Sequence, residues 1–208
     1  MRSLSFVKAG MAACVVAAMS FAATDANANL LTDPSFEGAL TFDGAPFVGS
    51  WEGFNAGPPS SAINGTTSPL SGVQTLELEI AGGANLFAGA FQDVSIVAGT
   101  SVTWSGSTLD AGADAGGQEI RIEWVDAGGG VIGATPNSVP ALTPGVYTPW
   151  SVTAVAPAGA QYARGVYAIQ SFGAGPNQLH YVDDVSIVPE PASLALLGLG
   201  GLAMIRRR

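Results

Sequence analysis

Cysteine, histidine and basic residues are scarce in this sequence, and each shortage excludes a class of chemistry. The 208 residues include one cysteine, Cys14, and one histidine, His180. A single histidine without further cysteine excludes the usual zinc sites, which take three or four such ligands. No serine lies in a Gly-x-Ser-x-Gly setting, so the nucleophile elbow of many hydrolases is missing as well. We therefore expect a protein that is not an enzyme.

The seven basic residues are concentrated at the two ends of the chain. Between residues 29 and 190 only Arg121 and Arg164 remain, against fifteen of the sixteen acidic residues. The formal net charge of that segment is therefore −13, compared with −9 for the whole chain. So acidic a segment will not bind nucleic acid by neutralising phosphates, and neutral partners or divalent cations suit it better.

The N-terminus has the features of a secretory signal peptide over residues 1–28. Arg2 and Lys8 form a basic start, residues 9–23 are small and apolar, and Ala26-Asn27-Ala28 is a cleavage site of the A-x-A kind. Cleavage after Ala28 would remove Cys14. The exported domain would then have to stay folded in an oxidising compartment without disulfide bonds.

The C-terminus, residues 189–208, has three parts in a fixed order. Pro189-Glu190-Pro191 ends the preceding strand, because two prolines cannot continue it. An apolar run of 14 residues, 192–205, and the arginines 206–208 follow. The run is shorter than the roughly 18–20 residues of a permanent transmembrane helix. On hydropathy alone it could equally be a short membrane span or a buried helix.

The order of the three parts resembles the PEP-CTERM sorting signal of Gram-negative bacteria. The resemblance implies export across the inner membrane and a transient association with that membrane through an apolar sorting helix. An exosortase-type processing enzyme would then cleave near Pro189, Glu190 and Pro191. The protein would be membrane-anchored before processing and extracellular or on the cell surface afterwards.

The segment between the two ends, 29–188, shows strand and turn signals throughout and predicts one domain. Short apolar alternations are separated by clusters of Gly, Pro, Asn and Ser, which is typical of an all-β sandwich or barrel of about eight to ten antiparallel strands. The clearest strand segments are 75–80, 85–94, 101–105, 118–126, 147–155, 161–171 and 178–187. In the last of these, alternation places Asp183 on one face with Tyr181, Val185 and Ile187, which predicts a core face.

Several short motifs resemble the galactose-binding-like jelly roll of many carbohydrate-binding modules. They are, in chain order, residues 29–38, 91–94, 98–100, 104–105, 122–126, 150, 156–160 and 181–187. In that family, matching acids help bind a structural calcium that ties the first strand to the last. The resemblance implies Glu37 and Asp183 as side-chain ligands, with carbonyl groups near Asp33 and Asp184 contributing. The alternative is a buried acid that is hydrogen-bonded to backbone amides, with Asp184 a solvated strand residue.

A sugar site requires aromatic platforms and polar groups that recognise hydroxyls. Trp51 and Phe54, beside a Gly-Pro-Pro-Ser-Ser loop, are the best candidates for exposed platforms. Trp104 and Trp124 alternate in phase with aliphatic residues, which favours core packing. Arg121 could recognise a hydroxyl or a carboxylate, or it could form a surface ion pair that contributes little.

Two functions remain open from the sequence. In the first, a secreted or cell-surface, non-catalytic protein associates with exopolysaccharide or another matrix component through a carbohydrate-binding-like domain. In the second, a structural matrix or surface-layer protein has no defined sugar site, and its acidic, Gly/Ala/Ser-rich surface serves packing and hydration.

Overall fold

The computed structural model describes residues 28–112, 117–173, 175 and 177–190, and all structural statements below concern these residues. Within them, Asn29–Val188 form one compact unit. The predicted signal peptide before Ala28, and Pro191 with the apolar tail, lie outside the described residues. No helix in the described part is long and apolar enough to cross a membrane.

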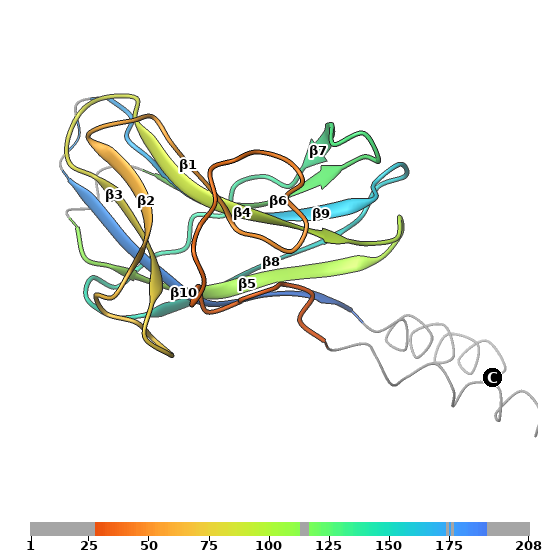
Figure 1. Cartoon of the computed structure of the whole chain (residues 1–208), viewed down its shortest axis with the longest axis horizontal. Coiled ribbons are helices and arrows are strands. Elements are labelled where there is room, and N and C mark those ends of the chain that lie inside the picture. Colours follow the sequence, from red (N-terminus) through yellow and green to blue (C-terminus); the bar gives the residue numbers. More distant parts are fainter. Residues whose placement is uncertain (1–27, 113–116, 174, 176, 191–208) are drawn as a thin grey trace, which may run out of the picture. The chain divides into compact units, whose positions relative to one another are not determined.

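The described chain forms ten strands in two sheets that pack as a sandwich (Figure 1). The first sheet, called the β9 sheet, has the order β1 (Glu52–Asn55), β4 (Phe87–Ser95), β9 (Tyr162–Gln170), β6 (Gly117–Val125) and β7 (Val131–Ala134). The second, called the β10 sheet, has the order β2 (Ser60–Gly65), β3 (Thr75–Ile80), β10 (Gln178–Pro189), β5 (Ser101–Asp110) and β8 (Thr148–Val155). The strand pairs β1–β4, β4–β9, β6–β9, β6–β7, β2–β3, β3–β10 and β5–β8 are antiparallel. The all-β sandwich is therefore confirmed.

Alternation along β3 and β6 places one face of each strand in the core between the sheets. Leu76, Leu78 and Ile80 of β3 are fully buried, as are Ile120 and Ile122 of β6. Burying side chains of this size stabilises the fold by roughly 1.5–3 kcal/mol each. Trp104, Trp124 and Trp150 pack in the same core, where Trp104 and Trp150 meet edge-to-face with ring centroids 5.0 Å apart.

The prediction that Asp183 shares a face with Val185 and Ile187 is wrong. The core side chains of β10 include Val182 and Val185, which are three residues apart and therefore out of phase. Between them Asp184 takes a left-handed φ of 50°, and one such residue shifts the alternation to the other face. Asp183 therefore lies on the outer face of the β10 sheet, yet it is fully buried.

Candidate functional site

The first residues of the compact unit are hydrogen-bonded to the last strand. The Asn29 side chain donates to the Val185 carbonyl at 3.0 Å and accepts from the Ile187 amide at 3.0 Å. The backbone amide of Leu30 donates to the Ile187 carbonyl at 2.9 Å. This junction brings the predicted calcium residues of both ends into one region.

The Asp183 carboxylate is occupied by backbone donors. Its Oδ2 accepts from the amides of Leu70 and Ser71 at 2.8 and 3.0 Å, and its Oδ1 accepts from the Asp184 amide at 2.7 Å. Burial raises the pKa of Asp183, and the three backbone hydrogen bonds oppose that rise. The loop 68–74 therefore covers Asp183 and explains how an outward-facing carboxylate is buried.

The other three acids of the junction have donors from the chain as well. Glu37 Oε1 accepts from the amides of Val73 and Gln74 at 2.8 and 3.1 Å, in the same loop. Gly72 lies between these contacts with φ +62°, and a Cβ there would overlap the Glu37 carboxylate. Asp33 caps the amides of Glu37 and Gly38 at 2.8 and 2.7 Å.

Asp184 accepts hydroxyl hydrogen bonds. Its Oδ1 receives Ser71 Oγ at 2.6 Å and Ser35 Oγ at 3.1 Å. Among the described residues, no three His, Cys, Asp or Glu side chains converge as a metal-binding group. In the structure these acids accept hydrogen bonds from amides and hydroxyls, whereas a bound calcium ion would take six to eight oxygen ligands.

Calcium binding therefore stays a prediction of the family resemblance. A metal that binds only the folded state raises the melting temperature with its concentration. The resemblance predicts that calcium raises the melting temperature of residues 29–190 by several degrees relative to excess chelator, and that Glu37→Gln abolishes the rise. Equal melting curves in calcium and chelator would contradict it.

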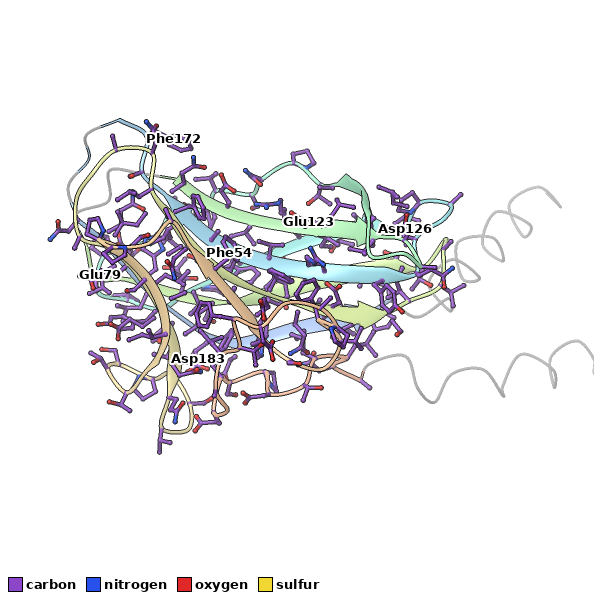
Figure 2. The ribbon with its side chains drawn as sticks, turned by 45° about the horizontal axis from the view of Figure 1, so that its top comes forward. Phe54, Glu79, Glu123, Asp126, Phe172 and Asp183 are labelled. Atoms are coloured by element: carbon purple, nitrogen blue, oxygen red, sulfur yellow. The ribbon has the colours of Figure 1, made fainter. Side chains whose placement is uncertain are left out.

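A second group of candidate residues lies on the outer face of the β9 sheet, the face turned away from the core. The register aligns Phe91, Val166 and Arg121 across β4, β9 and β6, and it aligns Asp93, Arg164 and Glu123 in the adjacent row. Figure 2 labels Phe54, Glu123 and Phe172, which belong to this side of the sandwich.

Charged residues in these two rows, together with Glu119 in the next row, form a continuous network. It is here called the charged ladder and is made of Asp93, Arg164, Glu123, Arg121 and Glu119. Arg121 lies between Glu119 and Glu123, with N–O distances of 2.8 and 2.7 Å. Arg164 binds both Asp93 oxygens, at 2.7 and 3.1 Å, and lies 3.6 Å from Glu123. Arg121, the predicted candidate, and Arg164 are therefore both engaged in ion pairs.

Phenylalanines occupy the β1 and β4 side of the same face. The Phe54 ring lies over Gly89, where a Cβ would overlap it, and its centroid is 6.1 Å from that of Phe87 and 6.0 Å from that of Phe91. Beyond the end of β9, Phe172 lies over Gly117 of β6. Phe87 is 40% exposed and Phe172 is 61% exposed.

The structure separates the two predicted platforms. Phe54 is half-buried on the outer face, whereas the sequence predicted an exposed platform. Trp51 is only 4% exposed, packs on Phe36 with centroids 4.5 Å apart, and donates its indole N–H to the Asp33 carbonyl. Residues three apart on an extended chain point to opposite faces. The expectation that Trp51 is exposed is therefore wrong.

Sequence reasoning missed Phe87 and Phe172. Phe87 is one residue out of phase with Ala88 and Ala90, whose small side chains are in the core, so the pattern itself predicts an outward ring. Phe172 follows the last residue of β9, and only its position beside Gly117 connects it to this face. No periodic pattern in the sequence predicts the contact between Phe172 and Gly117.

Comparisons with known proteins bear on the C-terminal motif and on the fold of the domain. Residues 188–208 match the PEP-CTERM protein-sorting motif, and no curated protein matches the chain. The fold is similar to the CBM22-1 xylan-binding domain of Paenibacillus barcinonensis Xyn10C, at 16% identity and a TM-score of 0.54, over 80% of this chain and 97% of that one.

Similar folds also occur inside larger proteins. They include the enzymatically active domain of bacteriophage CBA120 tailspike protein 4 (13% identity, TM-score 0.54, 77% of this chain) and the arabinofuranosidase MgGH51 (14%, 0.54, 78%). This chain spans only 21% and 26% of those two. The motif indicates export and exosortase-type sorting in Gram-negative bacteria. The chain thus has a jelly-roll β-sandwich of the kind found in carbohydrate-binding modules, followed at its C-terminus by a PEP-CTERM protein-sorting motif.

Proposed function

We propose that this protein is a non-catalytic glycan-binding protein of the bacterial surface, and that the outer face of the β9 sheet is its binding face. After processing by an exosortase-type enzyme it would act outside the cell, in contact with exopolysaccharide. The observation that carries the proposal is the arrangement of Phe54, Phe87 and Phe172 on the same face as the charged ladder.

The chemistry of this face suits a sugar chain. Sugar rings have apolar C–H faces that pack on aromatic rings and hydroxyls that bond to fixed polar groups. Phe87 and Phe172 offer exposed rings, and Glu119 and Arg121 offer polar atoms on β6. Strands in a sheet are about 4.8 Å apart, so β4 and β6 are about 10 Å apart across β9. Phe87 is aligned with Gln170 of β9, and Glu119 is aligned with Ala168, two residues along the same strand. The side chain of Ala168 is small and leaves this part of the face open between β4 and β6.

Removing the two exposed rings tests the proposal. We expect Phe87→Ala combined with Phe172→Ala to weaken glycan binding about tenfold or more, because two apolar contact surfaces are lost. The measurement is retardation of the full chain, in non-ionic detergent, on native gels that contain a neutral polysaccharide such as xylan or glucan.

Val155→Ala is the control, because Val155 is 61% exposed on β8 of the other sheet. It should leave retardation unchanged. If the double phenylalanine variant and the control bind equally well, the glycan is not held by this face.

A structural matrix or surface-layer role is the second candidate. It is favoured by the burial of all four tryptophans, none of which is more than 6% exposed, since exposed tryptophan is the strongest platform for sugar stacking. Under this alternative a panel of neutral polysaccharides would give no retardation of the wild-type chain.

A further inference from the structure

The two arginines of the charged ladder are the only basic residues between 29 and 190 apart from His180. His180 is 1% exposed, so it offers no surface charge. A cationic side chain for an anionic ligand could therefore come only from Arg121 or Arg164. Whether either guanidinium is free decides which glycans the domain can bind.

Arg164 is enclosed on every side that the structure describes. Its edges meet Asp93 at 2.7 Å and Glu123 at 3.6 Å. Its guanidinium carbon lies 4.2 Å from the Phe91 ring centroid and 5.0 Å from that of Phe47, which are cation–π distances. The residue is 9% exposed, so Arg164 cannot reach a ligand without breaking this enclosure.

Arg121 is more accessible but is already neutralised. Its side chain is 22% exposed, and it is held between Glu119 and Glu123. Charge-assisted pairs of this geometry are the strong ones among protein hydrogen bonds. A ligand carboxylate would have to displace one of two carboxylates that are fixed on the same strand.

Acids outnumber arginines on this face. Glu119, Glu123 and Asp93 belong to the ladder, and Glu52 of β1 lies beside Phe91, where it accepts from Thr41 Oγ1 at 2.9 Å and the Gly44 amide at 3.0 Å. Four acids against two arginines leave a formal charge of −2. An anionic group brought to this face would lose water without gaining a free cationic partner.

We infer that the outer face of the β9 sheet binds uncharged glycans and excludes those that carry carboxylate or sulfate groups. This inference rests on the proposed function and adds the class of ligand to it. The carboxylates of the charged ladder can accept hydrogen bonds from sugar hydroxyls, while its arginines are already paired and do not bind anions. This selection against anionic glycans is here called the filter.

Exchanging the two flanking glutamates tests the filter. Glu119→Gln with Glu123→Gln releases Arg121 from its carboxylates and removes two negative charges from the face. The control is Glu77→Gln with Glu79→Gln, which makes the same charge change on β3 of the other sheet. Full chains are run on native gels that contain either a neutral polysaccharide (xylan, glucan) or the polyuronate alginate.

We expect the neutral gels to retard the wild-type chain and the alginate gel not to. The Glu119/Glu123 variant should gain affinity for alginate about tenfold or more, because a freed guanidinium can bond to a uronate, and the Glu77/Glu79 control should gain none. Thermal melts establish that both variants are folded.

Two results would overturn the filter while leaving glycan binding intact. In one, alginate retards the wild-type chain as strongly as the neutral polysaccharides do. In the other, both double variants gain the same affinity for alginate, so that only overall charge matters. A wild-type chain that no neutral polysaccharide retards would instead overturn the proposed function, and the filter with it.

Discussion

Lowering the pH from 7 to 4 is expected to reduce the free energy of unfolding of the domain by about 3 kcal/mol through the protonation of His180 alone. His180 lies between the sheets, 1% exposed, with Nδ1 3.0 Å from the Tyr167 hydroxyl. Its Nε2 has no hydrogen-bond partner within the described residues, and the nearest carboxylate oxygen, of Asp110, is 3.9 Å away. Burial lowers the pKa of His180 to about 4, and Asp110 opposes the effect only in part.

The sign follows from which state takes up the proton. The unfolded chain protonates histidine near pH 6.5, whereas the folded domain resists protonation until about pH 4. Between these values the unfolded state binds more protons, so the free energy of unfolding falls as the pH falls. A pKa difference of about 2.5 corresponds to about 3 kcal/mol. The loss is complete below pH 4 and absent above about pH 7.

Urea unfolding of residues 29–190 at pH 7 and pH 4, for the wild type and His180→Gln, isolates this contribution. Asp183 acts in the opposite direction, because its raised pKa makes the protonated folded state more favourable as the pH falls. That contribution is common to both proteins, and so the difference between their pH slopes belongs to His180. Parallel pH dependences would show that His180 is protonated equally in both states.

Local patterns in the sequence predicted the sandwich well because strand periodicity is a local property. The alternation of Leu76, Leu78 and Ile80, and that of Ile120 and Ile122, identified β3 and β6 and their core faces. Burial of Trp104 also followed from its phase. Strand alternation relates residues that are two positions apart, so a single sequence is enough to recognise it.

The candidate sites depended on contacts that no local pattern contains. Asp183 binds the amides of Leu70 and Ser71, more than 110 residues earlier in the chain. Its face was mispredicted because one left-handed residue, Asp184, shifts the register. The burial of Trp51 could have been predicted, since its odd spacing from Phe54 already places the two side chains on opposite faces. The contact between Arg164 and Glu123 depends on the antiparallel register of β6 and β9, which the sequence alone does not give.

Asp183→Ala is expected to lower the free energy of unfolding by about 3 kcal/mol or more. The carboxylate is fully buried and accepts the amides of Leu70, Ser71 and Asp184. Each buried donor left without an acceptor costs about 1–3 kcal/mol, and water entering the opened loop recovers part of that sum. The loop should loosen first, because Asp183 and Glu37 together hold four of its amides.

Two further measurements separate this role from general damage to the core. Hydrogen exchange at the Leu70 and Ser71 amides should accelerate in Asp183→Ala, while exchange in β6 and β9 changes only by the global loss of stability. Asp183→Asn keeps the shape and one acceptor oxygen, so its cost should be smaller than that of alanine. Glu79→Ala, on the outer face of β3, should have little effect on either observable. If Asp183→Ala unfolds at the same urea concentration as the wild type, the loop is held by Glu37 and the serine hydroxyls, and the buried carboxylate contributes nothing net.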